Sequence, residues 1–159
     1  MKTLLRELLD IPSPTFKEGP ILNFISDWLS RELPSMTKKV SENGLIGYFP
    51  IRKNLPTIAL VGHVDVVPEH FKSNEIGGKI FGAGASDMKG ADAAFLTFLA
   101  THGSRALEKH NLVLILYTKE EGTPVEENGL YHLFVEQPDI FEAIDLAIVG
   151  EPTDTSIQV

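Results

Sequence analysis

The chain has 159 residues, of which 43% are hydrophobic, and 22 Asp and Glu against 14 Lys and Arg give it a net charge of −8. This length and composition are typical of one globular domain with a hydrophobic core. The acidic balance disfavours nucleic acid as a partner, because a negative surface repels phosphate backbones. Most of the acidic residues are expected to form an ordinary solvated surface.

The absence of cysteine excludes disulfides, thiolate metal sites and cysteine nucleophiles. The first residues, MKTLLRELLD, carry acids among their leucines and do not match the apolar core of a signal peptide. The longest apolar runs, such as residues 112–116, are too short to cross a bilayer. We therefore expect a soluble, cytoplasmic protein that does not act on membranes.

The first third of the chain predicts helices followed by a hairpin. Residues 2–9 predict a short helix, and Thr15 with Glu18 matches a capping box that would begin a second helix. Apolar residues at helical spacing continue that second helix to residue 29, and Pro34 is expected to end the region. Short strands would follow at 38–41 and 45–49, joined by the turn signal Asn43-Gly44.

The rest of the chain predicts buried strands that alternate with helices. The order is a buried strand at 57–67, a turn region around 74–78, a short strand at 79–81, a helix at 88–101, a strand at 111–118, a helix near 126–135 and a third buried strand at 145–150. Such alternation indicates an α/β fold with a mostly parallel central sheet flanked by helices.

Acidic or metal-binding side chains follow three of these strands. In open α/β sheets, ligands bind beyond the carboxyl ends of the strands, so these residues are expected to meet at one edge. They are His63 and Asp65, into which the apolar run 57–62 leads, Glu120 and Glu121 after the second strand, and Glu151 after the third.

Asp87 lies in the glycine-rich loop 82–90, just before a predicted helix, and could join the same cluster. A phosphate cradle is the alternative for this loop, but it matches neither GxxxxGK[ST] nor GxGxxG, and Asp87 would repel phosphate. Taken singly, a histidine after a strand is more often structural, and paired glutamates more often belong to the surface.

Together these residues would crowd up to five carboxylates around one imidazole. Without a cation such a cluster is unfavourable, because the carboxylates lose solvation and repel one another. Two divalent ions would turn the cluster into a ligand set. Imidazole and carboxylate without thiolate favour Zn²⁺, Co²⁺ or Mn²⁺, and a short carboxylate such as Asp87 is suited to bridge two ions.

Four motifs carry a family resemblance: GHVDVVP at 62–68, GAGASDMKG at 82–90, KEEG at 119–122 and GEPT at 150–153. In order and spacing they resemble the signatures of the M20 family of metallopeptidases and deacylases. The resemblance implies a zinc-peptidase-like catalytic domain that uses two divalent metal ions, most often Zn²⁺, with Co²⁺ possible.

The resemblance also implies a role for each metal ligand. His63 and Glu151 would bind the first metal ion and Glu121 the second, while Asp87 would bridge the two. The final ligand of the second site is a histidine from a later segment of the family fold. His70, His102, His110 and His132 lie outside the motifs and do not match it, and His132 is expected to be structural.

Two further residues are assigned catalytic roles by the same resemblance. Glu120 would be the general base that takes a proton from the attacking water, and Asp65 would hold the imidazole of His63 in place. Lys119 departs from the small or acidic residue common before the glutamate pair, and we expect it to alter the rim of the site.

The resemblance further implies that residues 1–159 are the N-terminal part of a catalytic domain. A lid domain that mediates homodimerisation, and the C-terminal part of the catalytic domain, would lie outside this chain. The expected activity is removal of an acyl group from an N-acyl amino acid. The motifs look most like the succinyl-diaminopimelate desuccinylase branch, which serves lysine and diaminopimelate biosynthesis.

Other interpretations stay open at this stage. Acetylornithine deacetylases and di- or carboxypeptidases of the same family are close alternatives. A different class is a truncated, non-catalytic module that binds metal or a partner, which should expose apolar sheet surface. A purely structural α/β domain would leave the carboxylate cluster unexplained.

Overall fold

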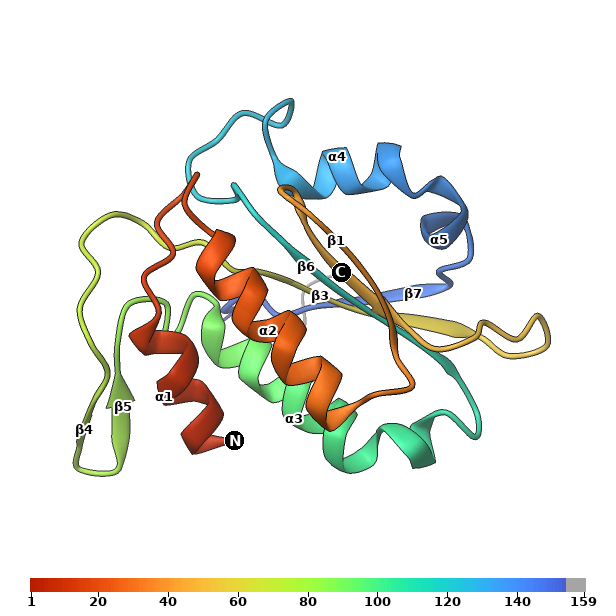
Figure 1. Cartoon of the computed structure of the whole chain (residues 1–159), viewed down its shortest axis with the longest axis horizontal. Coiled ribbons are helices and arrows are strands. Elements are labelled where there is room, and N and C mark those ends of the chain that lie inside the picture. The colour runs from red at the N-terminus through yellow and green to blue at the C-terminus, as the bar shows by residue number, and fades with distance from the viewer. Residues whose placement is uncertain (154–159) are drawn as a thin grey trace.

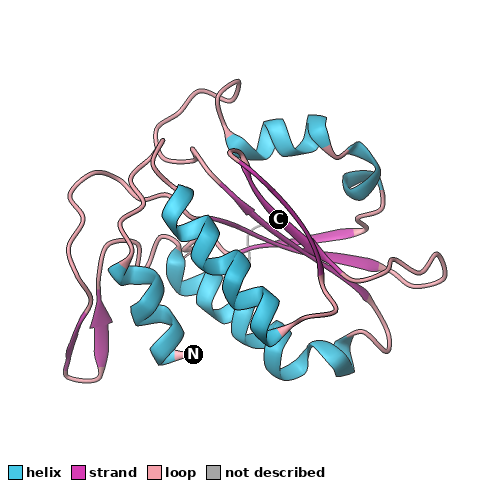
Figure 2. Cartoon of the chain, viewed as in Figure 1, coloured by secondary structure: helices cyan, strands magenta, loops and turns pink. Residues whose placement is uncertain are grey.

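The structure, a computed structural model, describes residues 1–153 of the chain and consists of a central sheet with helices on both faces (Figures 1 and 2). The helices are α1 (Lys2–Asp10), α2 (Gly19–Glu32), α3 (Lys89–Ala106), α4 (Gly129–Glu136) and α5 (Pro138–Glu142). The strands are β1 (Thr37–Ser41), β2 (Gly44–Tyr48), β3 (Thr57–His63), β4 (Asn74–Ile76), β5 (Lys79–Phe81), β6 (Asn111–Tyr117) and β7 (Leu146–Val149).

The central sheet of the described residues has the strand order β1-β2-β6-β3-β7. β3 is parallel to both β6 and β7, whereas β2 is antiparallel to β1 and to β6. All of these strands except β2 therefore run in one direction, which confirms the predicted mostly parallel α/β sheet. The carboxyl ends of β6, β3 and β7 lie at the same edge.

Strand β6 is buried along its whole length and divides the core into two layers. Leu112, Leu114 and Leu116 pack with α1, α2 and α3 on one face, and Val113, Ile115 and Tyr117 pack with α4 and α5 on the other. This alternation explains the nearly continuous apolar sequence, because helices cover both faces of the strand. Each such side chain contributes about 1.5–3 kcal/mol on burial.

The predicted helices are confirmed, but the predicted capping box is wrong. Thr15 lies outside α2, whose N-cap residue is Glu18, and no side chain caps that helix. The Thr15 hydroxyl instead donates to Asp65 Oδ2 at 3.0 Å. A capping box is a local pattern, and here a partner that is distant in sequence takes its hydroxyl.

The predicted hairpin is present with a turn one residue earlier than expected. Ser41 pairs with Gly44, so the turn residues are Glu42 and Asn43. Gly44 begins β2 with a φ of 147°, which residues with a side chain rarely adopt. Asn74, predicted in a turn, belongs to β4, and the β4–β5 hairpin lies against α1 (Figure 1).

Strand β7 differs from its prediction as a third buried strand. Leu146, Ile148 and Val149 are 55%, 45% and 53% exposed. Within residues 1–153, β7 pairs with β3 alone, so its outer edge has no neighbouring strand. An apolar groove of about 650 Å³ lies beside it, lined by Phe95 and Phe98 of α3 among other residues. The apolar sequence of β7 therefore reflects a surface that nothing covers in the described part of the chain.

No helix of residues 1–153 has both the length and the apolar character that a membrane span requires.

Candidate metal centre

The predicted site residues meet at the carboxyl edge of the sheet. His63 is the last residue of β3, Glu120 and Glu121 follow β6, and Glu151 follows β7. Asp87 belongs to the loop that leads into α3, whose amino end reaches the same edge. Because parallel strands deliver their carboxyl ends together, residues from three separate strands converge with the loop before α3.

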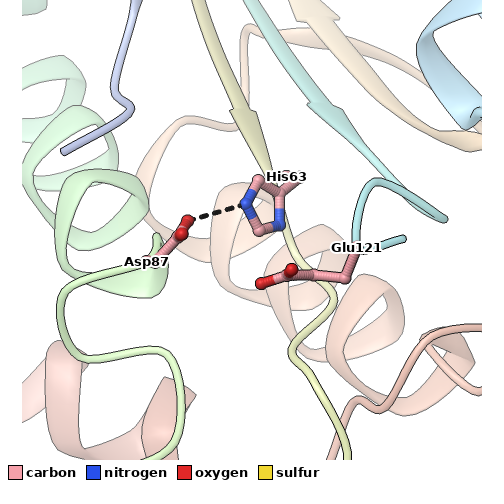
Figure 3. Close-up of side chains that lie close together, drawn as sticks. All are labelled: His63, Asp87 and Glu121. Atoms are coloured by element: carbon pink, nitrogen blue, oxygen red, sulfur yellow. Dashed lines mark hydrogen bonds and ion pairs between the residues drawn. The ribbon is translucent and has the colours of Figure 1, made fainter. Parts of the chain in front are cut away.

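His63, Asp87 and Glu121 form the centre of this cluster (Figure 3). Each offers a ligand atom, and these atoms all lie within 4.8 Å of one another. His63 Nε2 lies 2.9 Å from Asp87 Oδ1, 3.8 Å from Glu120 Oε2 and 3.7 Å from Glu151 Oε1. One imidazole nitrogen thus faces carboxylates from three segments of the chain.

The imidazole of His63 is fully buried, and Asp65 fixes its orientation through Nδ1. Its Nδ1 lies 3.0 Å from the backbone oxygen of Asp65 and 3.5 Å from Asp65 Oδ1, so the backbone of Asp65 is the nearer partner. Burial would lower the pKa of His63, but the surrounding carboxylates Asp65, Asp87 and Glu151 raise that pKa to about 10. With Nδ1 occupied in this way, Nε2 is the nitrogen left to bind a cation.

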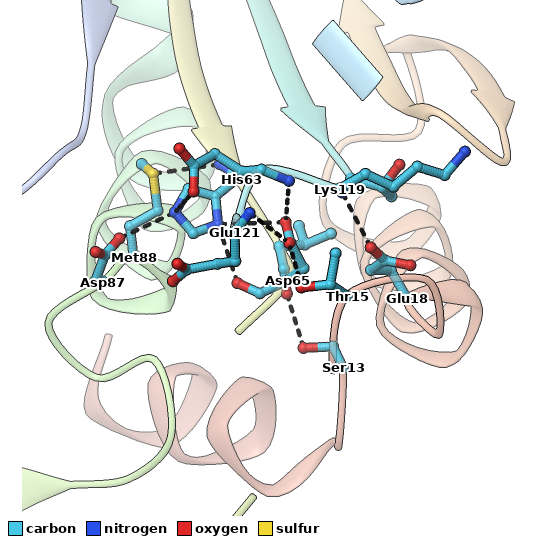
Figure 4. Close-up of polar contacts among 12 residues, drawn as sticks. Ser13, Thr15, Glu18, His63, Asp65, Asp87, Met88, Lys119 and Glu121 are labelled. Carbon is cyan, nitrogen blue, oxygen red and sulfur yellow. Dashed lines mark hydrogen bonds and ion pairs between the residues drawn. The ribbon is translucent and has the colours of Figure 1, made fainter. Parts of the chain in front are cut away.

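The carboxylate of Asp65 holds the polypeptide that carries the glutamate pair (Figure 4). Asp65 Oδ1 accepts from the backbone N–H of Glu120, and Oδ2 accepts from the N–H of Glu121 and the hydroxyl of Thr15, each at 3.0 Å. Burial would raise the pKa of Asp65, but His63 and the two backbone N–H groups hold it below its usual value. Asp65 therefore stays an anion that orders the site.

The remaining carboxylates repel one another. Burial, followed by the charge of Asp87, raises the pKa of Glu121. Burial also raises the pKa of Glu151, and Asp87 and Glu120 add to that increase while His63 opposes it. In both cases burial is the main cause, and the neighbouring carboxylates add to it because like charges disfavour the ionised form. Imidazole and carboxylate oxygen are also ligands that zinc-like ions bind, so this donor set fits a divalent metal.

Residues around the glutamate pair were missed or misassigned from sequence. Lys119, expected to alter the rim, turns its ammonium group to Asn43 Oδ1 at 3.2 Å. Glu18 accepts the backbone N–H of Lys119, and Ser13 Oγ donates to the backbone oxygen of Val64. The only sequence signal for these contacts was the concentration of Ser, Thr and Glu in the segment 13–18, a pattern that also predicts the start of a helix.

The histidines outside the motifs do not join the cluster. Among residues 1–153, the group of possible metal ligands contains His63 but not His70, His102, His110 or His132.

The sequence profile described as peptidase family M20/M25/M40 matches residues 59–159, which include all four motifs. The chain belongs to this family. An M20 relative, the succinyl-diaminopimelate desuccinylase of Corynebacterium glutamicum, is 36% identical over 153 residues. The match covers 94% of this chain and 41% of that relative, so the chain spans less than half of the relative's length.

Solved M20 structures share the fold. Human carnosine dipeptidase 1 superposes with a TM-score of 0.73 at 22% identity, covering 93% of this chain and 37% of that one. A dinuclear metal-binding M20 peptidase of Bacillus subtilis superposes with a TM-score of 0.69 at 19% identity, covering 93% of this chain and 41% of that one. At these identities the superpositions establish the α/β catalytic-domain fold.

Proposed function

We propose that this chain supplies the metal centre of an M20 amide hydrolase that removes an acyl group from an N-acyl amino acid. The observation that carries the proposal is the convergence of His63, Asp87 and Glu121, with Glu120 and Glu151 beside them. A structural domain would have no use for so many close carboxylates, because each raises the cost of charging the others.

In this proposal the cluster would bind two divalent ions. Zn²⁺ is the expected metal, and Co²⁺ is the alternative. His63 and Glu151 would hold one ion and Glu121 the other, and Asp87 would be a ligand of both. His63 Nε2 lies 2.9 Å from Asp87 Oδ1, and this short distance supports the proposal that both side chains bind the same ion. When bound, the ions would supply Lewis-acid activation of water and stabilisation of negative charge on the amide oxygen.

Glu120 is the proposed general base, which takes the proton of the attacking water and returns it to the leaving nitrogen. Its side chain is 35% exposed, so water and substrate can reach the carboxylate. Asp65 holds the N–H groups of both glutamates, so Glu120 and Glu121 keep fixed and different directions. One glutamate can therefore transfer the proton while its neighbour binds the metal ion.

In this proposal the substrate binds in a pocket of about 430 Å³ beside Asp87 and Glu121. Val67 and Phe71, both exposed, line it together with residues 82–86 of the glycine-rich loop. The proposed substrate is N-succinyl-diaminopimelate, which the name of the Corynebacterium relative supports. N-acetylornithine and short peptides are the alternatives within the family.

The proposal places residues 1–159 in the N-terminal part of the catalytic domain. The remaining ligand of the second ion, the lid and a homodimer interface would come from segments beyond these residues. The longer relatives support this arrangement, because the chain spans 41% of the Corynebacterium protein.

The roles of the adjacent glutamates are tested by Glu120→Gln and Glu121→Gln in the product of the native gene. Glu120→Gln should leave zinc affinity nearly unchanged and lower kcat by about 10²–10⁴-fold, the usual loss for a general base. Glu121→Gln should weaken zinc binding itself. Equal loss of zinc in both variants would show that the two roles are assigned wrongly.

The substrate is tested on the same wild-type protein with N-succinyl-diaminopimelate, N-acetylornithine and a dipeptide. Turnover of the succinyl substrate is the expected result. Turnover of N-acetylornithine alone would contradict the proposed substrate while leaving the amide-hydrolase chemistry in place.

The exposed apolar face of β7 favours a second candidate, a non-catalytic module that binds metal and pairs with a partner. Ile148 and the groove beside α3 are the observations behind it. A native gene product that binds zinc but hydrolyses none of the three substrates would favour this candidate.

A further inference from the structure

The segment that carries the glutamate pair has an unusual backbone. Lys119 has a φ of 59° and Gly122 a φ of 68°, so left-handed residues flank Glu120 and Glu121. A left-handed conformation is easy for glycine but costs free energy for a residue with a side chain such as Lys119. Contacts from the surrounding structure must therefore stabilise Lys119 in this conformation.

Glu18 makes the contact that fits this requirement. Its side chain reaches over 101 residues of sequence to accept the backbone N–H of Lys119 at 3.0 Å, through Oε1. The same oxygen accepts the N–H of Phe16 at 3.0 Å, and Phe16 is itself left-handed with a φ of 71°. One carboxylate oxygen of Glu18 thus accepts hydrogen bonds from two left-handed residues, and Figure 4 shows the bond from Lys119.

Glu18 and Asp65 together bind three consecutive N–H groups. The N–H of Lys119 donates to Glu18, and those of Glu120 and Glu121 donate to Asp65. The path of the backbone through the glutamate pair is therefore set by the side chains of two acidic residues from outside the segment.

The other roles open to Glu18 do not account for its position. It is 4% exposed, so it is not a surface charge. Its side chain does not cap α2, although it occupies the N-cap position. None of the ion pairs found in residues 1–153 includes Glu18. The hydrogen bonds to the backbone are what offset the cost of burying this carboxyl group.

We propose that Glu18 is a positioning residue of the metal centre, which fixes Lys119 in its left-handed conformation and so directs Glu120 and Glu121 toward the site. This inference rests on the proposed function for the roles of the two glutamates. Glu18 does not touch the site itself, and it acts through the backbone of residues 119–121.

The test compares Glu18→Ala, Glu18→Gln and a matched control, Asn111→Ala, in the 159-residue chain. Asn111 is equally buried and lies at the opposite end of β6, where its side chain makes hydrogen bonds to Arg52, Leu55 and Thr57. Its loss should destabilise the same strand without reaching the site. Gln at position 18 keeps an oxygen that can accept both N–H groups.

Two readouts separate positioning from general destabilisation. The first is amide hydrogen exchange of residues 119–121 relative to residues 93–99 of α3, measured without metal. The second is the zinc Kd by calorimetry. Glu18→Ala should raise the exchange ratio and weaken the Kd by roughly 10-fold, as expected for loss of a group that orients a ligand. Glu18→Gln should restore most of both, and Asn111→Ala should change neither.

An exchange ratio in Glu18→Ala equal to that of the wild type would overturn the inference, and so would an Asn111→Ala variant that matches Glu18→Ala in both readouts. A wild-type chain that binds no zinc would contradict the proposed function instead. In that case the exchange ratio, which needs no metal, still decides whether Glu18 holds the segment.

Discussion

The carboxylate of Asp65 and the backbone N–H of Glu121, 56 residues apart in sequence, are joined by a hydrogen bond of 3.0 Å. This bond connects the end of β3 to the segment after β6, so the histidine and the glutamates of the site share one support. A change at Asp65 should therefore disturb ligands that it does not itself provide.

Replacing Asp65 with Ala removes the acceptor of three hydrogen bonds in one step. We expect the variant to bind zinc about 10–100-fold more weakly, as is usual when groups that orient metal ligands are lost. Calorimetric titration of the folded variant measures the change.

Thr15→Val is the control for Asp65, because it removes one of the same hydrogen bonds without touching the glutamate segment. It should cost about 1 kcal/mol of unfolding free energy and leave the zinc Kd close to that of the wild type. If Thr15→Val weakens zinc binding as much as Asp65→Ala does, the hydrogen bonds from the N–H groups of residues 120 and 121 do not explain the effect of Asp65→Ala.

Asp92 gives a prediction about pH. Its side chain is fully buried at the start of α3, and neither carboxylate oxygen has a hydrogen-bond partner among the described residues. It packs so closely under β3 that a Cβ on Gly62 would overlap Asp92 Oδ1. Burial raises the pKa of Asp92 well above its ordinary value of 3.8, although His63 and Lys89 oppose that shift.

The raised pKa fixes the sign of the pH effect. Above pH 3.8 the unfolded chain loses the Asp92 proton while the folded chain keeps it, so this group makes the folded state less stable as pH rises. Asn at this position cannot titrate. Asp92→Asn should therefore match the wild type near pH 4 and exceed it at pH 8, with a gap that grows by at most about 1.4 kcal/mol per pH unit.

Urea unfolding at several pH values measures this gap. A difference between Asp92→Asn and the wild type that stays constant with pH would mean that Asp92 is charged in the folded protein.

The site could be predicted from the sequence because its candidate ligands lie at strand ends. His63, Glu120 and Glu151 each lie at or shortly after the end of an apolar strand, and parallel strands bring such ends together whatever their separation in the chain. Thr15 and Glu18 could not be read in this way. Their spacing matches a local helix cap, and the partners that use their oxygens lie 50 and 101 residues away.

Strand β7 shows a second reason for the limits of prediction. An apolar run indicates what a strand can bury, but Ile148 is exposed because nothing in residues 1–153 covers it. The pattern correctly identified a strand, and its degree of burial depended on segments outside the pattern.

The exposed edge of β7 predicts association of the 159-residue chain. Apolar residues on an unpaired strand edge favour contact with other copies, and a charge on that edge opposes it. Ile148→Lys should lower the apparent mass in light scattering toward that of a monomer. Val40→Lys, at an exposed apolar position on the other edge strand β1, should have a smaller effect, because the groove beside α3 adjoins β7. A wild-type chain that is monomeric at high concentration would contradict this prediction.

The central claim, that His63, Asp87 and Glu121 form a metal site, is tested most directly by zinc titration of the 159-residue chain and its Asp87→Ala variant. We predict saturable binding to the wild type that is weakened at least about 10-fold in the variant, because Asp87 is the carboxylate nearest to His63 Nε2. Equal binding by both proteins, or no binding by a folded wild-type chain, would contradict the claim.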